Sequence, residues 1–185
     1  YGGIMASILS VEQLRGLSSG DTPNTVTLPT GQTLDFSAGT LTMPAGHVIQ
    51  TVTDVRNYAS SVAISSTSYT SLGIGISITP KYASSKIAII YDVGMAYTKD
   101  LAVSLAVARN NVVINAGPGN AYGHYQRHAS NVNFYIPITL ATIDEPNTTD
   151  QVNYDLFGKM WGSGTNGEVP HNSSAVSIIL QEISG

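Results

Sequence analysis

The chain has 185 residues, which is long enough to bury a hydrophobic core of its own, and it has no cysteine, which excludes disulfides and cysteine-ligated zinc sites. Charged residues make up 11% of the chain and the formal net charge is −4, so no basic surface for nucleic acid is expected. No apolar run approaches the roughly 20 residues that a membrane-spanning helix needs.

The first predicted element is a short helix within residues 8–20, ILSVEQLRGLSSG. Ser10 followed by Gln13 fits a capping box, and Gly16 with an apolar residue after it fits a glycine C-cap. A helix of about one to two turns is unstable alone in water, so it must pack either on its own domain or into a larger assembly. In the second case residues 1–20 form an attachment segment. Its apolar contacts are Ile8, Leu9, Val11, Leu14 and Leu17.

A strand–turn–strand unit occurs twice within residues 21–50, with a period of fifteen: VTLPTGQTL from Val26 and LTMPAGHVI from Leu41. In LPTG and MPAG the proline at the second position and the glycine at the fourth suit a type I β-turn. Apolar residues alternate along each strand and form one edge, which an isolated hairpin cannot bury. This edge consists of Val26, Leu28, Leu34, Phe36, Leu41, Met43 and Ile49.

Two interpretations of this repeat remain open. A period of fifteen with a proline or glycine turn resembles the triple β-spiral of viral fibre shafts, such as that of adenovirus, in which three copies bury their apolar edges around a common axis. Residues 21–50 would then form a stalk. In the other interpretation the two units are ordinary first strands of a β-sandwich.

Residues 51–185 have the alternating pattern of β-strands. Residues 72–78 alternate between large aliphatic side chains and Gly or Ser, and in residues 86–97 the apolar face runs from Ile87 through Val93 to Tyr97. Pro137, on the polar face of a strand within residues 132–140, predicts an edge strand. Eight or nine strands separated by turn signals predict an all-β head with the fold of an antiparallel β-sandwich or jelly roll.

The faces opposite the apolar ones carry Gly, Ala, Ser and Thr rather than Lys and Glu. A monomeric sandwich normally has charges on its outer face for solubility and to protect its edges. The pattern therefore favours an oligomer whose faces are covered by neighbours, and the shaft-like repeat favours a homotrimer.

No motif for catalysis, metal binding or cofactor binding is found. His124 and His128 lack the carboxylate of a metalloprotease motif, and no serine lies in a G-x-S-x-G sequence. We expect no metal, no cofactor and no enzyme activity. Two carboxylate pairs, Asp144 with Glu145 and Asp150 with Asp155, could serve a glycosidase only if the fold brought them to a working separation.

The sequence richest in binding groups is AGPGNAYGHYQRHAS, residues 116–130, predicted to be a long loop. Aromatic rings and a planar guanidinium suit a sugar or a protein partner, and they equally suit a subunit interface, which we favour. Trp161, the only tryptophan, is expected to be packed rather than exposed. The candidate binding residues of the loop are Tyr122, His124, Tyr125, Arg127 and His128.

The chain resembles fibre and appendage proteins of tailed phages, particularly those infecting marine bacteria and cyanobacteria. The resemblance is carried by GQTLDFSAGTLTMPAGHVIQ, TSYTSLGIGISITPKYASSKIAIIYDV and the terminal SSAVSIILQEI, and MASILSVEQLRGL is similar to the N-terminal segments of those proteins. It runs from Met5 to the end and is weakest between Gly94 and Asp155. It implies a homotrimer in the virion, with residues 1–20 attached to the particle, residues 21–50 forming a stalk and residues 51–185 forming a head.

We therefore expect a structural virion protein, a short homotrimeric fibre on the capsid or tail. Its head would contact host surface glycans or neighbouring virion subunits. A free lectin-like sugar-binding module is the alternative. A phage depolymerase is the third hypothesis, and it would require a carboxylate pair in a cleft.

Overall fold

The computed structural model describes residues 30, 31, 33, 43–99, 102–115, 124–127, 133–161, 167–172 and 174–185. The chain divides into two compact units, residues 1–42 and Met43–Gly185, and all strands of the described residues belong to the second. The helix predicted within residues 8–20 lies outside the described residues. Within the described part of the chain, no helix has the length and apolar character needed to cross a bilayer.

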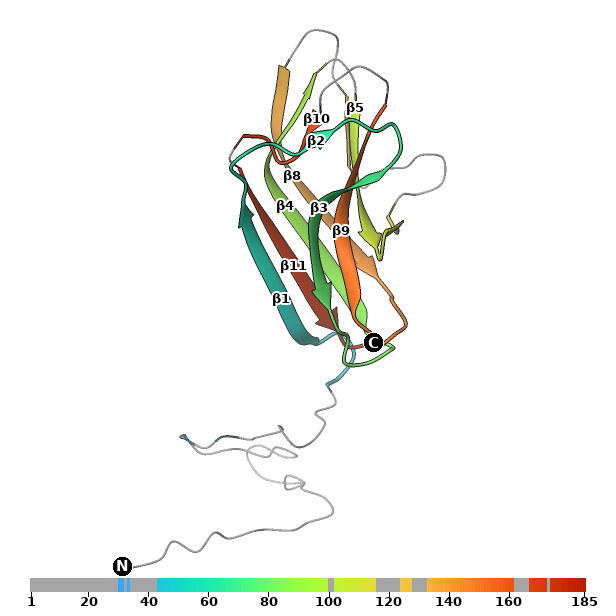
Figure 1. Cartoon of the computed structure of the whole chain (residues 1–185). Coiled ribbons are helices and arrows are strands. Elements are labelled where there is room, and N and C mark those ends of the chain that lie inside the picture. The colour runs from blue at the N-terminus through green and yellow to red at the C-terminus, as the bar shows by residue number, and fades with distance from the viewer. Residues whose placement is uncertain are drawn as a thin grey trace, which may run out of the picture. The chain divides into compact units, whose positions relative to one another are not determined.

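The described residues form two antiparallel sheets, which confirms the predicted all-β class (Figure 1). The first sheet consists of β1 (Val48–Asn57), β11 (Ala175–Ile183), β4 (Lys86–Lys99), β10 (Gly167–Glu168) and β2 (Ala63–Ile64) in this order, with β8 (Asn133–Asp144) on the other edge of β4. The second sheet has the order β3 (Thr70–Ile78), β9 (Val152–Met160), β5 (Ala102–Arg109) and β6 (Val112–Val113), and β7 (His124–Arg127) also pairs with β5.

Buried side chains of both sheets belong to one hydrophobic core, so the sheets face each other across it. Alternation produces this core: in β11, Val176, Ile178 and Leu180 are buried, while the residues between them are half-buried on the opposite face. Tyr91 of β4 crosses the core, and its hydroxyl donates to the backbone oxygen of Tyr154 in β9 at 2.8 Å. Burial raises the pKa of the Tyr91 phenol, which keeps it protonated as a donor.

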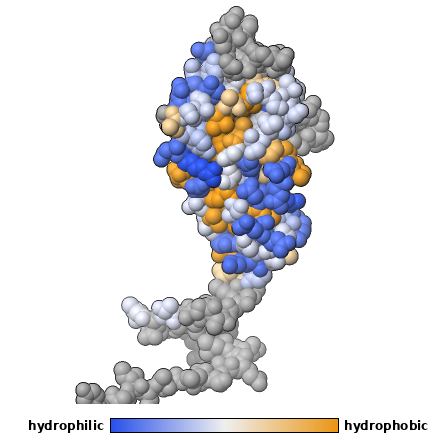
Figure 2. All heavy atoms as spheres, viewed as in Figure 1, coloured by the Kyte–Doolittle hydropathy of each residue, from blue (hydrophilic) through white to orange (hydrophobic). Residues whose placement is uncertain are grey.

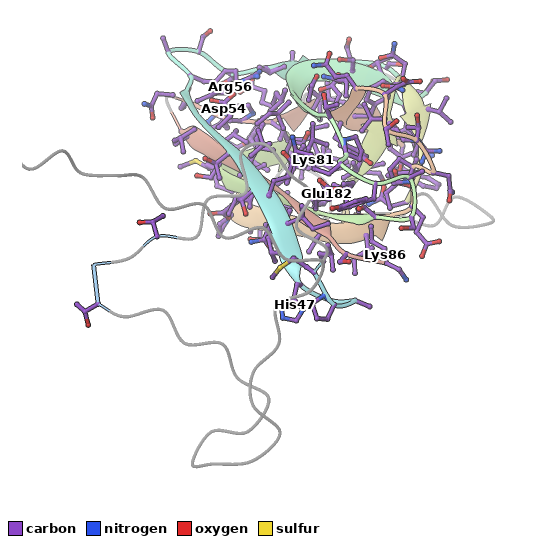
Figure 3. The ribbon with its side chains drawn as sticks, turned by 90° about the horizontal axis from the view of Figure 1, so that it is seen from below. His47, Asp54, Arg56, Lys81, Lys86 and Glu182 are labelled. Carbon is purple, nitrogen blue, oxygen red and sulfur yellow. The ribbon has the colours of Figure 1, made fainter. Side chains whose placement is uncertain are left out.

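Arg56 connects the edge strands of the two sheets. It leaves β1 and donates to the backbone oxygens of Gly73, at 3.1 Å, and Gly75 in β3. Its Nε lies 2.7 Å from Asp54 Oδ2, and this hydrogen bond raises the pKa of the guanidinium (Figure 3). Gly73 has a φ of +69° at a bulge between Ser71 and Ile74, and Gly75 lies just beyond it, where the pairing with β9 is regular again.

The second unit begins with a turn at residues 43–47. The N–H of His47 donates to the oxygen of Pro44 at 3.3 Å, and Gly46 has a φ of +87°. Glycine therefore occupies the third position of a type II turn, so the predicted type I turn, with glycine fourth, is wrong by one residue. Gly31, the matching glycine of the first repeat, has a φ of +84° as well.

This turn is hydrogen-bonded to the end of the chain. Ser184 accepts from the N–H of Gly46 at 2.8 Å, donates its own N–H to His47 at 2.8 Å, and donates its hydroxyl to Met43 at 3.1 Å. β1 then pairs with β11 along its length, from Val48 opposite Ile183 to Asn57 opposite Ala175. We call the contacts between residues 43–47 and Ser184 the terminal clip.

Two of the predicted stalk residues belong to the second unit instead of a separate stalk. Met43 and Ile49 lie in the second compact unit, which begins at Met43, and Ile49 belongs to β1. The other predicted stalk residues lie outside the described ones: Val26, Leu28, Leu34, Phe36 and Leu41.

A fully buried carboxylate, Glu182 in β11, lies at the same end of the unit as the terminal clip. Its Oε1 accepts from the N–H of Lys81 at 2.7 Å, the N–H of Tyr82 at 3.2 Å and the hydroxyl of Ser85 at 2.7 Å. Its Oε2 accepts from Gln50 Nε2 at 2.6 Å. The carboxylate thus ties the loop between β3 and β4 to β1 and β11 (Figure 3).

Candidate functional site

The aromatic end cluster, which we define as Tyr97, Tyr135, His171, Glu168, Asn133 and Asn172, is the most distinctive side-chain group of the described surface. It lies where β4 ends and β8 begins, beside β10 (Figure 1). The rings of Tyr97 and Tyr135 have centroids 5.1 Å apart, and that of His171 lies 5.0 Å from Tyr97 and 5.1 Å from Tyr135. These separations are those of favourable ring contacts.

A β-bulge brings Tyr97 into this cluster. The pairing of β4 with β8 shifts between Val93 and Ala96, which reverses the alternation of buried and outward residues in β4. Ala96 and Thr98 are therefore buried, and Tyr97 lies on the outer side with Tyr135 of β8. Tyr135 is 48% exposed, so the cluster presents an aromatic ring to solvent.

His171 is held by hydrogen bonds on its backbone and on both ring nitrogens. Its N–H donates to the oxygen of Met95 in β4 at 2.9 Å. Nδ1 lies against the Glu168 carboxylate, which can only accept, so in the neutral ring Nδ1 donates and Nε2 accepts from Asn172 Nδ2, at 2.8 Å. The imidazole is thereby fixed in one tautomer and one orientation.

Glu168 is the charged group of the cluster. Hydrogen bonds from Ser61 and from His171 lower the pKa of this carboxyl, against the opposing effect of burial. Its side chain is 27% exposed and that of His171 is 11% exposed, so the pair is partly shielded from solvent.

This lowered pKa predicts a pH-dependent contribution to stability. A carboxyl whose pKa is lower in the folded chain stabilises the fold above its unfolded pKa and loses that contribution as the pH falls through the folded value. We expect Glu168→Gln to lower the melting temperature at pH 7 and the difference from wild type to vanish well below pH 4.5, the ordinary value for this carboxyl. Thermal unfolding between pH 3 and 7 measures this, and an undiminished difference at the acidic end would contradict it.

A second surface is the outer face of the first sheet, where the residues of four strands lie in register. The rows across β1, β11, β4 and β8 are Thr51, Gln181, Ala88 and Ile143; Thr53, Ile179, Ile90 and Ala141; and Val55, Ser177, Asp92 and Thr139. Asp92 is the one charged residue of these rows, and it accepts a hydrogen bond from Thr139 at 3.0 Å. Val55 and Ile143 are 64% and 63% exposed.

The second sheet carries a smaller aromatic group. The Lys159 ammonium lies 4.9 Å from the centre of the Tyr69 ring and 4.4 Å from that of Trp161, whose Nε1 donates to Ser104 at 2.6 Å. The expectation that Trp161 is packed rather than exposed is wrong in part, because the residue keeps these contacts while 36% of it is exposed. Figure 2 shows apolar patches among hydrophilic ones on one side of the molecule.

The predicted binding loop, residues 116–130, is described only in part. Tyr122 and His128 lie outside the described residues. His124, Tyr125 and Arg127 belong to β7, which pairs with β5, so the prediction of a long loop is wrong for these residues. The predicted attachment residues also lie outside the described ones: Ile8, Leu9, Val11, Leu14 and Leu17.

The candidate carboxylates are engaged in structural contacts. Asp144 lies 2.9 Å from Arg109 Nη1 and accepts from the Tyr154 hydroxyl at 2.7 Å. Asp155 is 7% exposed and accepts from the Ser71 hydroxyl.

The remaining two candidates are exposed: Glu145 lies 2.9 Å from the Lys86 ammonium, and Asp150 precedes β9. Among the residues that the structure describes, no three His, Asp or Glu side chains are grouped to hold a metal ion.

Sequence reasoning missed the aromatic end cluster. Tyr135 left a signal, because it is an aromatic residue on the solvent side of an alternating strand. The sequence gives no such indication for Tyr97 and His171. A bulge in β4 brings Tyr97 into the cluster, and a hydrogen bond from the His171 N–H to the Met95 oxygen brings His171 into it. The chain matches no protein-family model, and comparison with curated proteins finds no relative of significant sequence similarity.

Proposed function

We propose that this chain is a non-enzymatic structural protein of a virion, a short homotrimeric fibre on the capsid or tail. Its head would meet host surface glycans or neighbouring virion subunits. The observation that carries the proposal is that residue 43 and the aromatic end cluster lie at opposite ends of the second unit. Residue 43, where the unit begins, lies at the Lys86 end of β4, and the aromatic end cluster lies at the Tyr97 end. At about 3.3 Å per residue, these ends are roughly 35 Å apart.

We further propose that the head is a jelly roll. In that fold the chain crosses repeatedly between two facing sheets. The long strands β1, β4, β8 and β11 belong to the first sheet, and β3, β5 and β9, which alternate with them along the chain, belong to the second. The placement of the last strand, β11, between β1 and β4 also agrees with this topology.

The outer face of the first sheet supports the homotrimer. In a symmetric assembly a surface repeats in every copy, so charges near the axis lie close to like charges. The three central rows of this face contain a single charged residue, and the Lys86–Glu145 ion pair lies at its end, whereas an exposed sheet face of a monomer normally carries charges throughout. We propose that this face meets its counterparts in sister copies.

The role of the N-terminal segment can be tested by deleting residues 5–20. We expect the truncated protein to fold and to trimerise as the full chain does, because the second unit holds its own core. We also expect it to be absent from particles assembled in its presence, as judged by electron microscopy and by co-sedimentation. Full-length protein is the control, and decoration of the particles by the truncated protein would rule out the attachment role.

A free lectin-like module is the second candidate, and the exposed Tyr135 ring of the aromatic end cluster favours it. The two candidates differ in assembly. A lectin would bind glycans as a soluble monomer without affinity for any particle, whereas a fibre would be trimeric and present on the virion.

A further inference from the structure

We propose that the aromatic end cluster binds a neutral hexopyranose, which stacks on Tyr135 and is hydrogen-bonded by the amides of Asn133 and Asn172. This inference names residues and a ligand class for the head, and it rests on the proposed function only for the host surface as the source of the sugar. The site differs from the loop of residues 116–130 to which the sequence assigned binding.

The exposed ring has the properties of a stacking platform. One face of a pyranose presents C–H groups, which pack on an aromatic ring, and rings with few rotatable bonds lose little entropy on binding. Tyr135 is 48% exposed and is held by Tyr97 and His171, whose centroids each lie 5.1 Å from its own. The platform is therefore in place before a ligand arrives.

The two exposed amides supply complementary hydrogen-bonding groups. Asn133 Oδ1 accepts from the Tyr97 hydroxyl at 3.2 Å, which leaves Nδ2 as the donor towards a ligand. Asn172 Nδ2 donates to His171 Nε2 at 2.8 Å, which leaves Oδ1 as the acceptor. A sugar hydroxyl both donates and accepts, so a donor beside Tyr97 and an acceptor beside His171 suit a pair of hydroxyls.

Charge distinguishes neutral from acidic sugars. Glu168 carries a carboxylate at the cluster, stabilised in its charged form by Ser61 and His171. A sugar carboxylate at this place would meet a like charge, so uronic and sialic acids should be disfavoured.

The test is saturation-transfer NMR on the full chain with glucose, galactose, mannose and N-acetylglucosamine, and with glucuronic acid as the acidic probe. We expect a response to at least one neutral sugar at about 50 mM, well above a millimolar dissociation constant. Tyr135→Ala should weaken that binding at least about tenfold, and Tyr135→Phe should retain it, because the ring supplies the contact. Val112→Ala, at a residue 67% exposed on β6, is the matched control.

The outcomes separate this inference from the proposed function. Absence of any response to the neutral sugars, a stronger response to glucuronic acid, or full binding by a folded Tyr135→Ala protein would overturn the site. Circular dichroism confirms folding of each variant. Particle decoration is measured on the same proteins. If the chain binds a sugar but never decorates particles, the sugar site stands and the proposed role as a virion fibre is wrong. If it decorates particles but binds no sugar, the proposed role stands and the sugar site is wrong.

Discussion

Replacing Glu182 by alanine is expected to lower the free energy of unfolding by about 3–5 kcal/mol, through the donors that it leaves unsatisfied. The substitution removes a fully buried carboxylate and leaves its four donors, from Lys81, Tyr82, Ser85 and Gln50, without their acceptor. A buried donor without an acceptor costs about 1–3 kcal/mol. Water that enters the site satisfies some of the four donors, so the total loss of stability is smaller than the sum of their separate costs. Urea denaturation at pH 7 and at one protein concentration measures the effect, which should shift the midpoint without changing the slope.

Two further variants serve as comparisons for Glu182→Ala, one as a control and one with an intermediate expected effect. Glu145→Ala is the matched control, since its carboxylate is 61% exposed and pairs with Lys86, so its loss should cost no more than about 1 kcal/mol. Glu182→Gln should fall between the two, because its amide oxygen can still accept from the loop while its NH₂ group faces that of Gln50. Equal stabilities of Glu182→Ala and Glu145→Ala would show that the carboxylate is not the link between the loop and β11.

Lysine in place of Ile90 is expected to convert the proposed trimer into monomers at micromolar concentration. Ile90 lies in the central row of the outer face of the first sheet, between Ile179 and Ala141. If this face meets its counterparts, an ammonium there must be desolvated beside like charges of the other copies, which costs several kcal/mol per charge. Sedimentation equilibrium should then give one third of the wild-type mass.

The fold itself should tolerate this substitution, because Ile90 points away from the core and a lysine stem can lie along the sheet. Val55→Lys, at a residue 64% exposed on the same face, should also dissociate the proposed trimer. Val112→Lys, at a residue 67% exposed on β6, introduces the same charge elsewhere and should leave the mass unchanged. Trimers of unaltered mass for both Ile90→Lys and Val55→Lys would place the subunit contact on another surface.

The sequence predicted the strands of the second unit well, because alternation is a local signal. Ile87, Ile89, Tyr91 and Val93 are buried as the pattern indicates, and β8, which contains Pro137, pairs only with β4 among the described strands. The pattern failed after Val93, where the bulge exchanged the two faces and moved Tyr97 outward. A bulge depends on pairing with a partner strand, and the sequence of one strand does not contain that information.

The candidate site was less predictable for the same reason. Tyr97, Tyr135 and His171 are separated by more than thirty residues along the chain, and only the fold brings their rings together. Glu182 shows the same difficulty in the interior. A charged residue in an apolar strand gave no indication of the loop, about a hundred positions earlier, whose donors surround it.

The terminal clip determines how the second unit bears mechanical load. When the second unit is held at residue 43 and pulled at its opposite end, the force runs along β1, whose ladder with β11 extends from Val48 to Asn57. Ladder hydrogen bonds lie perpendicular to the strands, so this force shears the rungs together instead of opening them one after another. The second unit therefore resists a load along β1 with the combined strength of all the hydrogen bonds of this ladder.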